Sequence, residues 1–184
     1  MLIKATTKID YRTYREYYIF NFMQGRRSPW QPRLLIALPP LMAAAFLLLL
    51  LKDPTDIVNL IGLVLAVAFG LILAMVVLVM PRGYYRNVEK ILSIPVHFSF
   101  SEESFAVRTE SLSQAEPTSL KYDHLYKAYE TQRFFYLYLS AARPLILGKN
   151  DFSTGTAADL RQLLAKKIGQ RFQMTRPVRK SLAR

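Results

Sequence analysis

Few side chains in this sequence of 184 residues have the types and spacing that chemistry requires. The two histidines are His97 and His124, and Asp123 precedes the second, where a carboxylate could orient a catalytic base. Neither histidine lies in a metal-binding motif, and consecutive residues of a strand point to opposite faces of a sheet. We therefore expect surface histidines, no catalytic residue and no metal site. A hydrolase that uses His124 or Asp123 has no partner residues to support it.

Two other patterns are too incomplete to indicate chemistry. Glu102 and Glu103 are paired carboxylates in a turn, where we expect them to be solvated. Gly148 and Lys149 look like the end of a phosphate-binding loop, but the preceding glycine and the following serine or threonine are missing. The chain has no cysteine, which excludes disulfides, thiolate metal sites and a cysteine nucleophile. We expect no cofactor and no small-molecule substrate.

Two long apolar runs, Leu34–Leu51 and Ile57–Met80, follow one another and contain no charged residue. A bilayer core requires about 20 apolar residues per helix and tolerates about 17, so both runs are long enough to cross it. The short stretch 52–56 between them forces the two helices to be neighbours. The sequence therefore predicts a transmembrane helical hairpin over 34–80. Transport by this chain alone is not expected, because ion pathways usually need charged side chains inside the spans.

The basic residues gather at one end of the predicted hairpin. The net charge is +12, and arginines flank both spans, whereas the loop between the spans has one basic residue, Lys52. Basic residues close to a span mark its cytoplasmic side, which predicts a multi-pass protein of the inner membrane with both termini cytoplasmic. Contact with anionic lipid headgroups explains this charge better than nucleic-acid binding does. The candidate lipid contacts are Arg26, Arg27, Arg33, Arg82 and Arg86.

The second span has small residues at a spacing of four, with an asparagine on nearly the same face. Such residues let two helix backbones approach closely, and an amide can form a hydrogen bond across the contact. This seam packs either on the first span, through Ala37 and the Ala43–Ala45 cluster, or on a second copy in a homodimer. In the first span, Pro39 and Pro40 predict a kink or a helix start. The residues of the expected seam are Asn59, Gly62, Ala66, Gly70 and Ala74.

Residues 1–33 are expected to form a cytoplasmic amphipathic segment. Four aromatic residues lie three or four positions apart, which is the spacing of one helix face, and Asp10 suits the N-cap position. The aromatic face lies either at headgroup depth, together with Trp30, or against the soluble part of the chain. The four residues are Tyr11, Tyr14, Tyr18 and Phe22.

After a connector at 81–93, the apolar residues change to a period of two, which is typical of strands. We expect a small antiparallel β-domain over 94–171, in which Phe134–Leu139 is apolar on both faces, as in a central strand. The apolar spacing in Thr156–Arg171 predicts a helix that covers one opening of the sheet. The expected strands are Ile94–Phe100, Phe105–Thr109, Thr118–Leu125, Tyr126–Thr131, Phe134–Ser140 and Pro144–Leu147.

A basic tail is predicted over 172–184, in a stretch that begins at Lys166 and contains no acidic residue. Each basic residue near an anionic leaflet contributes on the order of 1 kcal/mol, so the tail can hold the domain against the membrane. The alternative is a disordered soluble end.

The chain resembles the YcxB-like family of bacterial membrane proteins. The residues that carry the resemblance are Phe98–Val107, Leu120–Glu130, Phe134–Leu139 and Pro144–Phe152, together with the C-terminal helix, the two spans and the N-terminal aromatic segment. The resemblance implies a two-helix anchor followed by a cytosolic domain similar to bacterial pleckstrin-homology (PH) folds, a bent sheet closed at one end by a helix. It supplies no catalytic residues. The expected fold class is therefore membrane α + β.

The sequence favours a non-enzymatic inner-membrane protein whose PH-like domain docks a protein partner or the anionic inner leaflet. Phosphoinositide-reading PH domains have a basic first hairpin loop, whereas this loop has Glu102 and Glu103, so we do not expect inositol-headgroup binding there. The alternative is a subunit or regulator of a membrane transporter or envelope enzyme that acts through its transmembrane helices. We expect a protein partner or a homodimer, and no nucleic acid.

Overall fold

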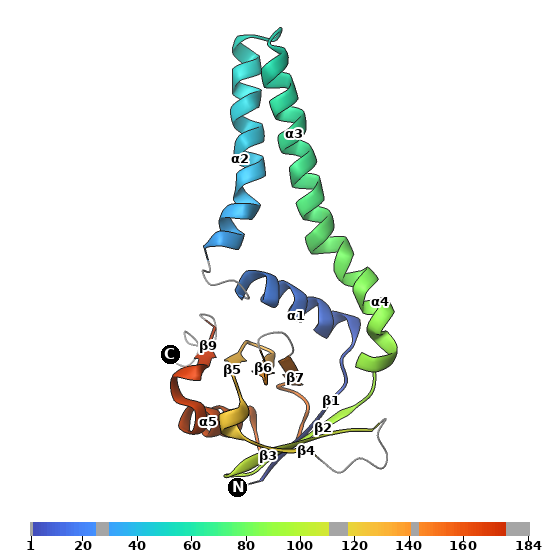
Figure 1. Ribbon diagram of the computed structural model, residues 1–184, viewed down its shortest axis with the longest axis vertical. Coiled ribbons are helices and arrows are strands. Elements are labelled where there is room, and N and C mark those ends of the chain that lie inside the picture. Colours follow the sequence, from blue (N-terminus) through green and yellow to red (C-terminus); the bar gives the residue numbers. More distant parts are fainter. Residues whose placement is uncertain (1, 25–29, 111–117, 141–143, 176–184) are drawn as a thin grey trace. The chain divides into compact units, whose positions relative to one another are not determined.

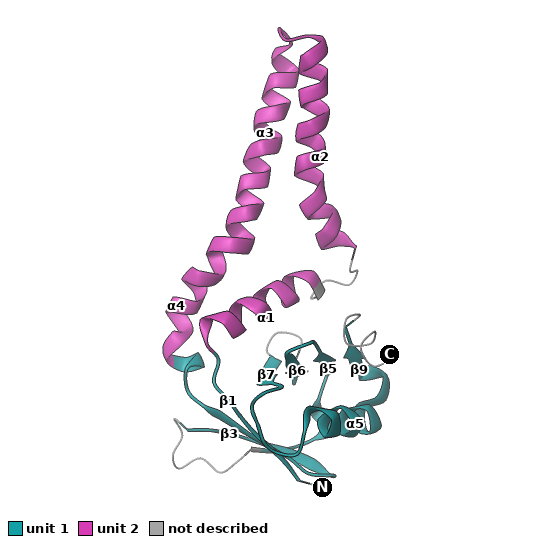
Figure 2. Ribbon diagram, turned by 180° about the vertical axis from the view of Figure 1, so that it is seen from behind, with its two compact units in different colours: residues 1–9, 91–184 teal, residues 10–90 magenta. Residues whose placement is uncertain are grey.

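The computed structural model describes residues 2–24, 30–110, 118–140 and 144–175 (Figure 1). The chain forms two compact units, a β-rich unit of residues 1–9 and 91–184 and a helical unit of residues 10–90 (Figure 2). Residues 1–33 were predicted as one N-terminal segment, and the structure divides that segment between the two units.

The helical unit contains the two long apolar helices that the sequence predicts. Its elements are α1 (Tyr11–Gln24), α2 (Gln31–Lys52), α3 (Ile57–Ala74), a π-helical turn η1 (Met75–Val79) and α4 (Met80–Leu92) as far as Lys90. Because α3, η1 and α4 are continuous, a single helix of 36 residues runs from Ile57 to Leu92. This helix and α2 are both long and apolar enough to cross a membrane.

Prolines are accommodated inside both long helices. Helix α2 begins at Gln31 and runs through Pro39 and Pro40, so the predicted helix start at these prolines is wrong. Residues 81–93 were predicted as a connector, and they are helical as far as Leu92. Pro81 has no N–H to offer the preceding turn, and the π-helical turn η1 ends two residues before it, where the helix absorbs this irregularity.

The β-rich unit consists of two sheets and a helix. Sheet A comprises β1 (Ile3–Thr7), β2 (Val96–Phe100), β3 (Ser104–Thr109), β4 (Thr118–Lys121) and β8 (Phe152–Thr154), in the order β4-β3-β2-β1-β8. Sheet B comprises β5 (Lys127–Glu130), β6 (Phe134–Tyr138), β7 (Pro144–Gly148) and β9 (Phe172–Met174), in the order β7-β6-β5-β9. Helix α5 (Ala157–Ile168) follows β8, and the 3₁₀ turns are η2 (Tyr122–His124) and η3 (Gly169–Arg171).

The N-terminal strand β1 lies inside sheet A, a place that the sequence analysis did not predict. It pairs antiparallel with β2, from Ile3 opposite Phe100 to Thr7 opposite Val96, and it pairs with β8 on its other side. Its side chains alternate between buried and exposed, and Ile3 and Ala5 belong to the core. The start of the chain therefore completes the core of the C-terminal unit.

Sheet B is mixed, not antiparallel throughout. Strand β6 pairs antiparallel with β5 and with β7, but β9 pairs with β5 in parallel, with Phe172 opposite Ala128. The first residues of the predicted tail, 172–184, therefore form a strand, and those from 176 onward lie outside the described residues. Strand β6 lies between two others and is buried on both faces, as predicted for a central strand.

Helix α5 covers the core of the β-rich unit with one apolar face, so the predicted C-terminal helix is confirmed. Its buried leucines and isoleucine pack with side chains from both sheets. Thr156 caps the helix: its hydroxyl accepts a hydrogen bond from the N–H of Asp159, and the Asp159 carboxylate accepts one from the N–H of Thr156. The buried residues of α5 are Leu160, Leu163, Leu164 and Ile168.

Candidate functional site

Helix α4 has two faces of opposite chemistry. Arg82, Arg86 and Lys90 are exposed, and their spacing of four places them on one face of the helix. Pro81 and Tyr85 are buried. We call the three basic residues the α4 cationic face, and their concentration of positive charge is suited to binding anionic groups.

Helix α1 packs its tyrosines on the second long helix. The rings of Tyr11 and Tyr14 have centroids 5.6 and 5.7 Å from that of Tyr85. One turn further along α1, the hydroxyl of Tyr18 donates a hydrogen bond of 3.3 Å to the carbonyl oxygen of Val76 in η1. Within the helical unit, the predicted aromatic face therefore contacts protein, and the partner is the second long helix.

The structure places most of the predicted small-residue seam against α2. Ala66 is buried, and a Cβ atom at Gly62 would overlap with the ring of Phe46. A Cβ atom at Gly70 would lie 3.5 Å from the Cβ of Pro39, which is ordinary contact. The sequence left open whether the seam packs on the first span or on a second copy, and these contacts support packing on the first span.

The other residues expected at this seam do not show this close packing. Ala74 is exposed, and so are Ala37 and Ala44 on α2. The side-chain amide of Asn59 donates a hydrogen bond of 2.6 Å to the carboxylate of Asp56, the N-cap residue of α3. This amide therefore supports the start of its own helix through Asp56.

Three of the five arginines predicted as lipid contacts are described. Arg33, near the start of α2, is exposed, as are the two in α4. Arg26 and Arg27 lie outside the described residues. Lys90 was not predicted as a lipid contact, although its position four residues after Arg86 could have indicated the same helix face.

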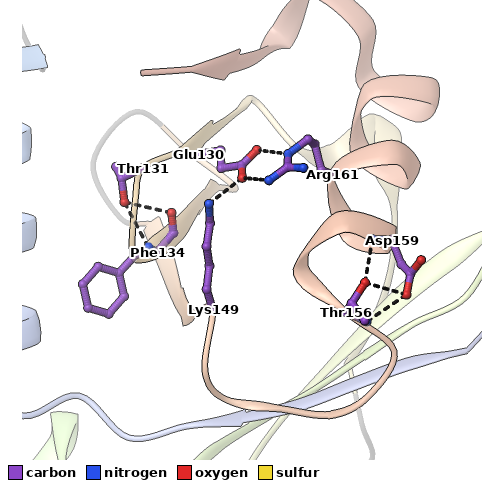
Figure 3. A network of polar contacts seen from close by, with 7 residues as sticks. All are labelled: Glu130, Thr131, Phe134, Lys149, Thr156, Asp159 and Arg161. Carbon is purple, nitrogen blue, oxygen red and sulfur yellow. Dashed lines mark hydrogen bonds and ion pairs between the residues drawn. The ribbon is translucent and has the colours of Figure 1, made fainter. Parts of the chain in front are cut away.

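A buried carboxylate is the most unusual polar group of the β-rich unit. Glu130 in β5 is fully buried, and Arg161 of α5 donates to it from Nε at 2.8 Å and from Nη2 at 2.6 Å (Figure 3). Lys149, in the turn after β7, donates from Nζ to the same carboxylate (Figure 3). Burial by itself would raise the pKa of Glu130, but the hydrogen bonds from the two cations hold the pKa below its usual value.

This cluster was not predicted, and its geometry fits a structural role. Both oxygens of Glu130 accept hydrogen bonds from cations, so the carboxylate is not placed to take a proton from a substrate. The sequence signal that could have indicated the cluster is the position of Glu130. It lies two residues after Ala128 in the same strand, so both side chains face the core.

The structure does not bring the predicted chemical side chains together. His97 on sheet A contacts the hydroxyl of Thr6 and the carboxylate of Glu110, each at 2.9 Å. Asp123 and His124 are exposed in η2 and not in a strand. Among the described residues, no group of three or more His, Asp or Glu side chains could hold a metal ion. The paired carboxylates Glu102 and Glu103 are exposed in the turn between β2 and β3.

A family model matches part of the β-rich unit. Residues 100–164 match the model of the YcxB-like protein family. The resemblance to the YcxB-like family is therefore confirmed over this part of the chain. Neither a curated protein nor a solved structure matches the chain.

The YcxB-like match begins in β2 and ends within α5. Glu130, Lys149 and Arg161 all lie inside it, so the buried cluster belongs to the matched part of the fold. The α4 cationic face and the seam lie in the helical unit, before the matched residues begin.

Proposed function

We propose that this chain is a non-catalytic inner-membrane protein. Its helical hairpin anchors the PH-like domain formed by the β-rich unit, and the α4 cationic face binds anionic lipids of the cytoplasmic leaflet. The observation that carries the proposal is the position of this face, which follows directly on the apolar part of the 36-residue helix.

The length of the apolar stretch supports this location. Ile57–Met80 is somewhat longer than the about 20 residues that a bilayer core requires, and a tilted helix accommodates the excess. Arg82 follows Met80 by two residues, so the cationic face begins at the headgroup layer. Each basic residue there contributes about 1 kcal/mol to binding an anionic surface.

The charges at the two ends of the hairpin support the orientation. Arg33 and the α4 cationic face flank the spans at one end, while Asp53 and Asp56 lie in the turn at the other end. Basic residues remain on the cytoplasmic side, so both termini are cytoplasmic in this proposal.

The contacts within the hairpin disfavour a role as a transporter subunit that acts through the same seam. Ala66 is buried and Gly62 lies against Phe46, so this part of the seam is covered by the chain's own helix α2. Docking of a protein partner on the β-rich unit is the other outcome that the experiments below distinguish.

Single cysteines test the insertion and its direction, because the chain has no cysteine of its own. Pro54→Cys places a thiol in the turn between the spans, and Ser153→Cys places one on exposed β8. In right-side-out membrane vesicles, we expect a membrane-impermeant maleimide to label the first variant directly and the second only after permeabilisation. The reverse pattern, or equal labelling of both, contradicts the proposed topology.

Lipid binding is tested by removing the cationic face. The variant Arg82→Gln/Arg86→Gln/Lys90→Gln is compared with Arg108→Gln/Lys121→Gln/Lys166→Gln, which removes as many exposed charges from the β-rich unit. Native mass spectrometry from nanodiscs of equal phosphatidylglycerol and phosphatidylcholine counts the retained lipids. We expect the original chain and the control to retain mainly phosphatidylglycerol. In the α4 variant, we expect the ratio of retained phosphatidylglycerol to phosphatidylcholine to fall at least tenfold. No preference in the original chain would overturn leaflet binding and favour a protein partner.

A further inference from the structure

A cavity of about 290 Å³ lies within the helical unit, where α1, α2 and the second long helix meet. Its walls are apolar side chains from all three helices. The lining residues include Phe22 of α1, Ile36 and Pro40 of α2, and Gly70, Ala74 and Val77 of the second long helix.

The cavity begins where the two long helices stop packing closely. At Gly70 the helices are still in contact, because an added Cβ atom would lie 3.5 Å from Pro39. One turn later, Ala74 is exposed and lines the cavity. Short side chains on one helix and two prolines on the other therefore leave a space that neither helix fills.

Helix α1 forms the third wall and is held there by a hydrogen bond. The hydroxyl of Tyr18 donates to the carbonyl oxygen of Val76 in the π-helical turn. Phe22 follows Tyr18 by one helical turn and lines the cavity. Val77, next to the bonded carbonyl, lines it as well, so the π-helical turn forms part of the site.

The proposed insertion places this cavity in the cytoplasmic half of the bilayer. An α-helix rises about 1.5 Å per residue, so Gly70 lies about 20 Å and Val77 about 30 Å from Ile57, in a hydrocarbon core of about 30 Å. The cavity therefore extends from the inner half of the core to the level of the headgroups.

We infer that this cavity holds one acyl chain of a phospholipid from the cytoplasmic leaflet. This inference rests on the proposed membrane insertion. A transmembrane helix, with a diameter of about 10–12 Å, does not fit a space of this size between three helices, whereas an extended hydrocarbon chain does. Arg33 is exposed on the same face of α2 as Ile36, one turn nearer the cytoplasm, where it can pair with the phosphate of the same lipid.

Quenching by a brominated lipid tests this site. Trp30 is the single tryptophan, so Phe22→Trp combined with Trp30→Phe places one indole in the cavity wall. Phosphatidylglycerol with dibrominated acyl chains is titrated into the full chain in detergent micelles. We expect quenching that saturates near one lipid per chain, whereas quenching that rises without saturation means that lipid dissolves only in the micelle and overturns the inference.

Two alanine substitutions provide the matched comparison. Ala74→Leu fills the cavity, and Ala68→Leu adds the same side chain to an exposed position of α3 outside it. We expect Ala74→Leu to raise the lipid concentration for half-maximal quenching at least tenfold and Ala68→Leu to leave it unchanged. Equal effects of the two substitutions would overturn the inference. It would also be overturned if quenching did not saturate and Ala74→Leu instead disrupted a homodimer, because a second copy would then occupy the cavity. The cysteine labelling described above reports insertion separately, so failure of this site and failure of the proposed anchor are distinguishable.

Discussion

Arg161 donates two parallel hydrogen bonds to the carboxylate of Glu130 and so joins α5 to a strand of sheet B. The two residues are 31 positions apart in the chain. Lys149 binds the same carboxylate from the turn after β7, so three elements meet at one buried negative charge. The position of α5 is therefore set by directional contacts as well as by its apolar face.

Removing the arginine should destabilise the β-rich unit. Arg161→Ala leaves the buried Glu130 carboxylate with Lys149 alone, and breaking a buried ion pair in this way costs about 3–5 kcal/mol. Hydrogen exchange of the full chain, read by mass spectrometry, should show a loss of about 3 kcal/mol of protection in β5 and α5. The control is Arg108→Ala, an exposed cation of sheet A, for which we expect a change within about 0.5 kcal/mol. Equal effects of the two variants would contradict a stabilising role for the cluster.

The lowered pKa of Glu130 predicts a loss of stability in acid. A carboxylate whose pKa is lower in the folded state contributes stability above its unfolded value, near 4.3, and that contribution disappears as the pH falls through the folded-state pKa. Unfolding of the β-rich unit should therefore become easier below about pH 4. In Glu130→Gln this part of the pH dependence should be missing, so the two unfolding curves should converge in acid. A constant difference between them from pH 7 to pH 3 would show that Glu130 does not titrate in this way.

The pairing of β1 with β2 and β8 predicts that the first residues of the chain stabilise the β-rich unit. Ile3 is fully buried between its neighbouring strands, while Leu2 beside it is about half exposed. Ile3→Ala should cost about 2–5 kcal/mol, as large-to-small changes in a core do, and Leu2→Ala should cost little. Exchange of the amides of β2 and β8, the partners of β1, measures both. If Ile3→Ala left this protection intact, β1 would not be part of the core.

Features set by neighbouring residues were predictable from the sequence. The apolar runs, the flanking arginines and the apolar face of α5 all depend on spacings within one helix. The carboxylate of Asp10 accepts a hydrogen bond of 2.8 Å from the N–H of Thr13, as predicted for an N-cap. This hydrogen bond also lowers the pKa of Asp10.

Features that depend on distant partners were missed. Strand β1 has only three inward side chains, and its place is decided by β2 and β8, which lie about 90 or more residues away. Strand β9 is short, and its pairing with β5 places a strand where composition indicated a tail. In the sequence, Glu130 is a single charged residue in a strand. Its partners Lys149 and Arg161 are distant in the chain, and only the fold places them next to it.

The close approach of Gly62 to Phe46 predicts how the hairpin responds to a single methyl group. Gly62→Ala forces the ring of Phe46 to move, and such overpacking costs about 1–3 kcal/mol. Gly83→Ala is the matched control, because beyond the neighbouring residues and backbone of its own helix no heavy atom of the described residues lies within 4 Å of the added methyl group. This change should strengthen the second long helix by up to about 1 kcal/mol, since alanine favours helix more than glycine does.

Titration of the full chain with SDS, followed by circular dichroism, compares the two variants. Gly62→Ala should lose its helical packing at a lower SDS fraction than the original chain, and Gly83→Ala should not. In a Phe46→Ala background the effect of Gly62→Ala should shrink, because the atoms that it displaces are gone. Equal effects in both backgrounds would mean that Gly62 meets something other than α2, and the homodimer seam would then become the better explanation of its spacing with Ala66 and Gly70.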